Sequence, residues 1–173
     1  MAVLDILVEG DPRLRQKAVK IRQVDASIRK LAEDMYETIP DAEGVAVAAP
    51  QVGVTRRLIV IRYTDVDEDD KDDEGVEITY RLANPEIARS HGNQVGLEGC
   101  LSIPGWVGEV PRSESVTVKA VDMENRAVRI KASGYLARVF QHEIDHLDGI
   151  LFTDRVVDKD TLKFVGTDDG AEL

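Results

Sequence analysis

Residues 141–149 constrain the possible fold and function of this chain more than any other stretch. They contain the pattern H-E-x-x-H within a segment whose apolar residues have helical spacing. Apolar residues recur here at the spacing of one buried helical face, namely Leu136, Phe140, Ile144 and Leu147. Ser133 stands where an N-cap would stand, and Gly149 stands where a helix would stop. The sequence therefore predicts a core-facing helix between Ser133 and Gly149.

The two histidines of this helix are four residues apart, so both project from one face on consecutive turns. His142 and His146 can therefore bind one metal ion, and Glu143, offset by one position, can take a proton from water on that ion. The alternative is a core-facing helix with two unrelated histidines. The chain has three histidines in all, so chance explains this spacing poorly. We interpret the helix as the metal-binding centre of a hydrolase.

A catalytic metal site of this kind needs a third protein ligand and one open position. A third histidine in the longer form of the motif would stand at position 152, which is Phe152, and the only later glutamate is Glu172, next to the C-terminal residue. The remaining soft ligand is Cys100, the single cysteine of the chain. A lone cysteine is more often a small buried hydrophobe, but beside two imidazoles a thiolate would complete the set. We therefore expect Cys100, His142 and His146 to be the metal ligands.

Three separated motifs, in order and in register, resemble those of the peptide deformylases, which remove the formyl group from the N-terminal methionine of new polypeptides. The motifs are Gly44 to Gln51, Glu98 to Ser102 and Gln141 to Gly149. Residues 11–15 and 84–86 fit the same pattern, so the resemblance covers nearly the whole chain. Ala46 departs from it, because the family has glycine there, and Val47 stands where leucine is usual. An added methyl at position 46 can narrow the substrate cleft or alter the local dihedrals.

The resemblance implies a role for each site residue. Glu143 would accept a proton from water and return it to the departing amine, while the Gln51 amide and the Leu101 N–H stabilise the oxyanion. The residues implied to bind the substrate are Gly44, Val45, Ala46 and Gly99, with Arg138 and Val139 beside the methionine side chain. The ligand set by itself favours Zn²⁺. The resemblance implies Fe²⁺ in the cell, replaceable by Zn²⁺, Ni²⁺ or Co²⁺.

The net charge of −11 is concentrated in one stretch, because residues 65–75 hold eight acids and one lysine. A calcium-binding loop that started at Asp65 would need glycine at its sixth position and glutamate at its twelfth. These positions are Asp70 and Val76, which excludes such a loop. We predict a solvated acidic loop instead. The negative charge also argues against direct DNA binding and against binding to anionic membranes.

The sequence shows no apolar stretch of membrane-spanning length, and its N-terminus lacks the basic and apolar regions of a signal peptide. A single cysteine also rules out an intrachain disulfide framework. We therefore expect a cytoplasmic monomer whose partners are N-formyl-methionyl nascent peptides. Transient contact with the ribosome is left open, because the acidic tail from about residue 158, which we predict to be frayed, offers no basic surface for rRNA.

We predict a single α+β domain over residues 1–173, in which short antiparallel strands pack around the central metal-binding helix. A second, amphipathic helix is expected over residues 28–39, with Ser27 as its cap. The expected strand pairs are 57–62 with 76–82 and 116–120 with 128–132. The second pair forms a hairpin that leads into the histidine helix.

Residues 84–105 are expected to be irregular, because prolines and glycines interrupt them. His91 in this segment is expected to be a solvated loop residue. Asp145 and Asp148 lie near the C-terminal end of the histidine helix, where the helix dipole disfavours anions. We therefore expect both to have partners, with Arg112 as the candidate for Asp145.

Two other functions are compatible with parts of this pattern. A general metallopeptidase would share the histidine helix, but its usual third ligands are missing. A degenerate family member could act as a metal-stabilised binding protein, which would need the metal but neither Glu143 nor Gln51.

Overall fold

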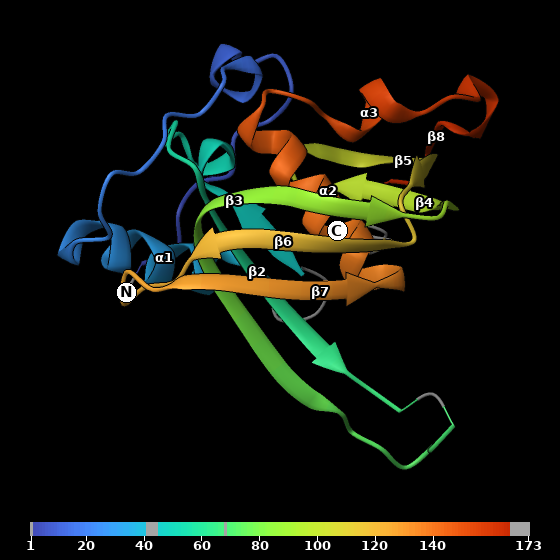
Figure 1. The fold of residues 1–173 in the computed structure, drawn as a ribbon. Coiled ribbons are helices and arrows are strands. Elements are labelled where there is room, and N and C mark those ends of the chain that lie inside the picture. Colours follow the sequence, from blue (N-terminus) through green and yellow to red (C-terminus); the bar gives the residue numbers. More distant parts are fainter. Residues whose placement is uncertain (1, 41–44, 68, 167–173) are drawn as a thin grey trace.

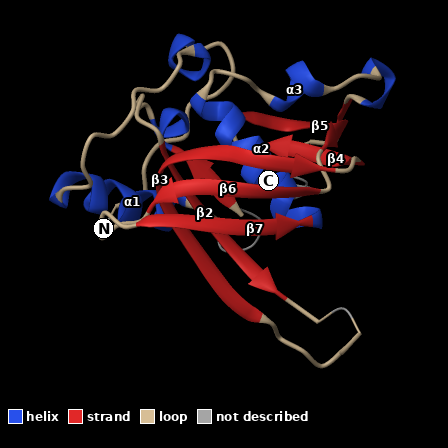
Figure 2. Ribbon diagram, in the orientation of Figure 1, coloured by secondary structure: helices blue, strands red, loops and turns tan. Residues whose placement is uncertain are grey.

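The computed structural model describes residues 2–40, 45–67 and 69–166 and has the α+β, single-domain architecture that the sequence predicts. The helices are α1 (Ala26–Thr38), α2 (Gly134–Leu147) and α3 (Phe152–Arg155), with 3-10 helices at Pro12–Arg15, Ala49–Val52 and Lys159–Thr161. The strands are β1 (Ala46–Ala48), β2 (Leu58–Asp65), β3 (Val76–His91), β4 (Gln94–Cys100), β5 (Ile103–Arg112), β6 (Ser115–Val121), β7 (Ala127–Ser133) and β8 (Lys163–Phe164). Figure 1 shows their arrangement, and Figure 2 shows the helices against the strands.

The strands form two antiparallel sheets, with the order β1-β2-β3-β6-β7 in the larger and β4-β5-β8 in the smaller. Both predicted strand pairs are confirmed. The β2–β3 pair runs from Leu58 opposite Ala83 to Asp65 opposite Val76, and β6 and β7 form the predicted hairpin that leads directly into α2. The second sheet brings Cys100, at the end of β4, to the side of α2 that faces away from the larger sheet.

The alternation of side chains along β2 gives the larger sheet two buried faces. Ile59 and Ile61 pack in the cluster that contains Phe140 of α2, whereas Leu58 and Val60 pack in the cluster of α1. The α2 helix therefore covers one face, and α1 covers the opposite face, with most of its contacts to β1 and β2.

The predicted histidine helix is confirmed as α2, which starts directly after Ser133. Phe140 and Leu147 of its apolar stripe are completely buried. Gly149 follows the helix with φ +74°, a left-handed conformation that suits glycine. Ser133 holds the cap position without a side-chain hydrogen bond, and the first helical N–H, that of Gly134, donates instead to the carbonyl of Glu114.

Two local predictions were wrong. The cap of α1 is Asp25 rather than Ser27, because the Asp25 carboxylate accepts from the Ile28 N–H at 3.0 Å, and the hydroxyl of Ser27 donates to the same carboxylate. Residues 84–105 are largely strand rather than irregular. Register shifts between residues 83 and 89 let β3 accommodate Pro85, which would otherwise break the ladder.

The described part of the acidic stretch 65–75 joins β2 to β3 at the end of a long hairpin that extends away from the body of the protein (Figure 1). After α3, the chain forms the 3-10 helix Lys159–Thr161 and the short strand β8, which pairs with β5. Residues 167–173 lie outside the described residues, so the frayed tail stays a prediction. Within the described part of the chain, no helix is both long enough and apolar enough to span a membrane.

Candidate metal centre

Two imidazoles from α2 and one thiol from β4 converge in the interior of the protein. The potential ligand atoms of Cys100, His142 and His146 all lie within 4.8 Å of one another, and all three residues are buried. Nε2 of His146 is 3.3 Å from Nε2 of His142 and 3.4 Å from Sγ of Cys100. The sequence-predicted ligands are therefore brought together, with one nitrogen of each ring turned toward the sulfur.

This donor set fits a tetrahedral metal ion. Sulfur and nitrogen ligands at their usual distances of about 2.3 and 2.0 Å from one ion lie about 3.3–3.6 Å apart, close to the separations seen here. The carboxylate oxygen Oε2 of the neighbouring Glu143 is buried and has no hydrogen-bond partner among the described residues. A buried polar atom of this kind normally has a partner, so the centre also has a place for a polar molecule beside its ligands.

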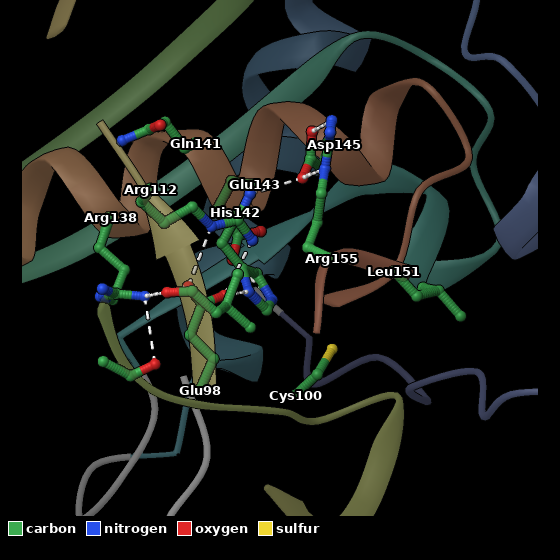
Figure 3. Close-up of polar contacts among 12 residues, drawn as sticks. Glu98, Cys100, Arg112, Arg138, Gln141, His142, Glu143, Asp145, Leu151 and Arg155 are labelled. Atoms are coloured by element: carbon green, nitrogen blue, oxygen red, sulfur yellow. Dashed lines mark hydrogen bonds and ion pairs between the residues drawn. The ribbon is translucent and has the colours of Figure 1, made fainter. Parts of the chain in front are cut away.

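Glu98 makes the centre electrostatically suited to a cation. Its carboxylate accepts a hydrogen bond from Nδ1 of His142 at 2.8 Å, so Nε2 of that ring is left for the metal (Figure 3). Burial alone would raise the pKa of Glu98, but hydrogen bonds from Arg112 and His142 outweigh burial and lower it to about 2. Burial likewise opposes a charged His142, but Cys100 and Glu98 raise its pKa to about 10. Positive charge is therefore favoured at this position.

Glu143 lies beside the three residues that could hold a metal ion. Its Oε1 is 4.0 Å from Nε2 of His142, and the side chain is buried. Burial raises its pKa to about 7, and the nearby His142 only partly opposes this effect. A carboxyl group with this pKa can both accept and release a proton near neutral pH.

Gln51 contributes an amide to the centre from the 3-10 helix Ala49–Val52, which follows β1. Its Oε1 accepts from the N–H of Ala48 at 2.9 Å, which fixes the orientation of the amide. Nε2 is thereby directed to Oγ of Ser102 at 3.1 Å and to Sγ of Cys100 at 3.5 Å. An amide donor is therefore held beside the thiol, and Leu101 follows the thiol directly in the chain.

The predicted partner of Asp145 is confirmed. Nη1 of Arg112 donates to Oδ2 of Asp145 at 2.6 Å, and the other nitrogens of Arg112 bind both carboxylate oxygens of Glu98. Asp145 also forms an ion pair with Arg155, and Asp148 forms an ion pair with Arg57 at 3.0 Å. Arg112 thus connects β5 to β4 and to α2 through carboxylates on either side of the metal ligands.

The residues expected to bind the substrate lie in different surroundings. Val45 directly precedes β1, and Ala46 is the first residue of β1. Gly99 is buried on β4, and Val139, a residue of α2, is packed in the core. Gly44 lies outside the described residues. Ala46 has an extended backbone, and its methyl group packs in the core cluster with only 1% of the residue exposed.

Sequence reasoning missed several parts of this network. Arg138 is buried, and its guanidinium forms an ion pair with Glu98. Phe152, where the longer motif has histidine, stacks on the ring of His142 with centroids 6.3 Å apart. The position of Glu98 beside the centre could have been predicted from the sequence. Residues i and i+2 of a strand share a face, and Cys100 follows Glu98 by two positions.

Comparisons with known proteins agree with this geometry. Residues 3–161 match the family model described as polypeptide deformylase. A peptide deformylase from Thermomicrobium roseum is 60% identical over 165 residues, covering 95% of this chain and 92% of that protein. The crystal structure of peptide deformylase from Thermus thermophilus superposes with a TM-score of 0.78 at 46% identity, covering 89% and 86% of the two chains. The crystal structure of a class I type b peptide deformylase from Acinetobacter baumannii with bound Met-Ala-Ser superposes with a TM-score of 0.80 at 33% identity. The match covers 90% of this chain and 99% of that chain.

Proposed function

The chain belongs to the polypeptide deformylase family, and on that premise we propose which of its residues carry out the reaction. It is a metal-dependent hydrolase that removes the N-formyl group from new polypeptides, releasing formate. The single observation that supports our assignment is the buried convergence of one thiol and two imidazoles, with a buried carboxylate beside them and an amide donor opposite.

We assign Cys100, His142 and His146 as the ligands of one divalent ion, Fe²⁺ in the cell, with Zn²⁺, Ni²⁺ or Co²⁺ as replacements. The mixed sulfur and nitrogen donor set suits borderline-soft ions of the first transition row. When bound, the ion supplies Lewis acidity, which polarises the formyl group and lowers the pKa of water toward about 7. The hydrogen bond between Glu98 and His142 holds the ligating ring in one tautomer.

Glu143 is the proposed proton carrier. Its Oε2, which has no partner among the described residues, accepts a proton from the attacking water, and the same carboxyl group returns that proton to the amine as the bond to formyl breaks. Its pKa of about 7 supports both directions of transfer near neutral pH. Because the group is buried, bulk water does not compete for the proton during the reaction.

Gln51 and Leu101 are the proposed donors to the oxyanion. The hydrogen bond from Ala48 fixes the amide of Gln51 so that Nε2 faces Cys100, and no reorientation is needed during the reaction. The N–H of Leu101 is placed by the turn between β4 and β5. Donors that are already oriented stabilise the developing charge more than mobile ones do.

The proposed substrate-binding residues are Gly44, Val45, Ala46 and Gly99, with Arg138 and Val139 near the methionine side chain. The relative from Acinetobacter baumannii was crystallised with Met-Ala-Ser, a peptide that begins with methionine. We extend this substrate class to the present chain. Arg138 contributes by holding Glu98 and β4 in place, since its guanidinium is already paired. We further propose that the protein is a cytoplasmic monomer, because formylated chains emerge from ribosomes in that compartment.

The direct test is formate release from an N-formyl-methionyl tripeptide by protein purified without oxygen and supplied with Fe²⁺ or Ni²⁺. The N-acetyl tripeptide is the matched control, since it differs only in the acyl group. We expect formate from the formyl peptide and no acetate from the control. A folded, metal-loaded sample that released no formate would favour a metal-stabilised binding protein, and cleavage within the peptide chain would indicate a metallopeptidase.

A further inference from the structure

The segment before the first 3-10 helix, residues 2–11, links α1 to the metal centre. We call it the N-terminal arm. At one end, its backbone N–H groups bind side chains of α1, because Ala2 donates to Asp34 at 2.7 Å and Leu4 donates to Thr38 at 2.8 Å. Both acceptor residues are buried, so this end of the arm is fixed to the helix.

The other end of the arm binds residues on two sides of the thiol. The N–H of Leu7 donates to the carbonyl of Gln51 at 2.7 Å, and the N–H of Glu9 donates to the carbonyl of Ser102, also at 2.7 Å. The two donors are two residues apart, so a short stretch of backbone reaches both carbonyls. Gln51 is a proposed oxyanion donor, and Ser102 follows the proposed ligand Cys100 by two positions. The arm therefore joins two parts of the centre that are distant in the sequence.

Ser102 connects these two parts a second time, through its side chain. Its buried Oγ accepts from Nε2 of Gln51 at 3.1 Å, and its N–H donates to Sγ of Cys100 at 3.4 Å. The hydrogen bonds among the arm, Gln51 and Ser102 thus form a closed ring. A side-chain amide has two N–H donors, so the amide of Gln51 can bind Ser102 with one and stabilise an oxyanion with the other. Leu101, the second proposed donor, shares the two-residue turn between β4 and β5 with Ser102.

The geometry of the arm at Glu9 is fixed by a β-turn. The N–H of Asp11 donates to the carbonyl of Val8 at 3.1 Å, which closes the turn over residues 8–11. Gly10 has φ +105°, whereas the φ of Glu9 is not positive, so the turn is of type II with Glu9 at its second position. The side chain of Glu9 is exposed. This residue therefore contributes to the centre through its backbone N–H.

We propose that the N-terminal arm positions the oxyanion donors. Leu7 and Glu9 hold Gln51 and the turn of Leu101 and Ser102 at the separation that the reaction requires. This inference rests on the proposed function, and Leu7 and Glu9 are positioning residues, because they act through Gln51 and Ser102. Donors that are oriented in advance stabilise developing charge most effectively, and a displacement of about 1 Å in such a site can cost about 10²-fold in rate.

The experiment compares Glu9→Pro with Glu9→Gln in the full, metal-loaded chain. Both variants remove the exposed carboxylate, but only proline also removes the N–H that binds Ser102. Proline is favoured at the second position of a type II turn, so the substitution suits the local backbone. With an N-formyl-methionyl tripeptide, the kcat of Glu9→Pro should be about 10- to 100-fold below that of Glu9→Gln, while KM stays within about twofold. Metal content and the urea midpoint should be equal in the two variants.

A second readout does not depend on turnover. Because the N–H of Ser102 contacts the sulfur of Cys100, a shift of the turn changes the hydrogen bond to the proposed thiolate ligand. In protein loaded with Co²⁺, the sulfur-to-cobalt charge-transfer absorption of Glu9→Pro should therefore differ from that of Glu9→Gln. A general loss of stability would not change this absorption in the folded, loaded protein.

The variant Ser102→Ala breaks the same ring at another bond and leaves the backbone of the arm unchanged. It removes the acceptor of the Gln51 amide, so kcat should fall about fivefold with KM unchanged. This variant decides the question if Glu9→Pro does not fold, because an unchanged kcat in Ser102→Ala would overturn the proposal.

Equal kcat and equal cobalt spectra in Glu9→Pro and Glu9→Gln would also overturn it. So would a fall in kcat that is accompanied by lost metal or by a lower urea midpoint, since the arm would then act on stability alone. A wild type that binds Co²⁺ but releases no formate would contradict the proposed function, and the cobalt spectra of the two Glu9 variants would still decide whether the arm positions the turn.

Discussion

At the scale of single residues, the centre depends on a buried carboxylate outside the proposed ligand set. Glu98 contacts His142, Arg112 and Arg138 at once, so an anion is kept in the interior by three donors. Such a buried charge is tolerable only when its partners are in place. The proposed proton carrier, Glu143, has the opposite environment, with one oxygen that has no partner among the described residues and a raised pKa. Environment rather than residue type therefore separates the roles of the two carboxyl groups.

The substitution Glu143→Gln should abolish turnover without releasing the metal. The amide cannot accept the proton from water, so formate release should fall by about 10²- to 10⁴-fold. The three ligand atoms are unchanged, so the metal content measured by elemental analysis should equal that of the wild type. Glu33→Gln, an exposed site on α1, is the control and should keep full activity. Near-normal turnover in Glu143→Gln would remove Glu143 from the mechanism.

The substitution Ala46→Gly restores the residue usual in the family and should lower stability more than it alters activity. Ala46 already has an extended backbone, so glycine relieves no strain. Glycine also removes a buried methyl group and gains entropy in the unfolded chain, which costs about 1 kcal/mol. We expect a lower urea midpoint and a kcat/KM within about threefold of the wild type. A gain in activity of about tenfold or more would show that the methyl narrows the cleft.

At the scale of elements, the site is assembled by Arg112 from parts that are distant in the sequence. Arg112 on β5 contacts Glu98 on β4 and Asp145 on α2, so it holds the smaller sheet against the ligand helix. Figure 3 shows it between these two carboxylates. Arg138 and Arg155 contribute further contacts to the same acids. The relative position of Cys100 and the two histidines therefore depends on this buried network.

The substitution Arg112→Ala should lower both stability and metal retention. Loss of one partner of a buried ion pair costs about 3–5 kcal/mol, and the remaining arginines should keep the loss near the lower value. Metal affinity, measured by competition with a chromophoric chelator, should fall by about 10- to 100-fold. The control Arg126→Ala removes an exposed arginine with two ion pairs and should cost less than about 1 kcal/mol. Unchanged metal affinity in Arg112→Ala would separate this network from the centre.

At the scale of the whole molecule, the metal centre joins two sheets that each have their own core. Cys100 belongs to the cluster of the smaller sheet, whereas the helix that carries both histidines packs on the larger one. An ion bound to all three residues would therefore link the two layers. A ligand that binds only the folded state stabilises it by mass action.

Removal of the metal by a chelator should therefore lower the melting temperature as well as abolish formate release. At a metal concentration of about 100 times Kd, binding contributes about 2.7 kcal/mol, which corresponds to roughly 5–10 °C for a chain of this length. Differential scanning calorimetry before and after addition of the chelator measures this shift. Added Fe²⁺, Ni²⁺ or Co²⁺ should restore both properties. An unchanged melting temperature in the metal-free protein would show that the ion does not link the sheets.

Stability should also depend on pH through Glu98. Its pKa is lowered in the folded state from 4.5 to about 2, so the ionised carboxylate stabilises the fold above pH 4.5. This contribution, on the order of 3 kcal/mol, is lost as the pH falls from 4.5 toward about 2. In metal-free protein, Glu98→Gln should be less stable than the wild type at about pH 6, and the difference should shrink by about pH 2.5. A difference independent of pH would assign the stabilisation to another group.

The sequence by itself determined the ligand helix, its cap position and stop, and the three residues that we propose as metal ligands. These features follow from local periodicity and from the scarcity of histidine and cysteine in the chain. It also determined the family, through three motifs in register, and the partner of Asp145. The cap of α1 could not be predicted because Asp25 and Ser27 are both good caps. The strands in residues 84–105 could not be predicted because the bulge at Pro85 depends on pairing with β6.

Only the tertiary structure decided how the charges are shared at the centre and which backbone groups contact it. The pairing of Arg138 with Glu98 and the stacking of Phe152 on His142 join residues from different elements, and no local pattern encodes such distances. The contact of the N-terminal arm with Gln51 and Ser102 is likewise invisible in the sequence, because it is made by backbone N–H groups, which every residue except proline carries. The path of the chain, rather than the side chains of the arm, places these groups beside the centre.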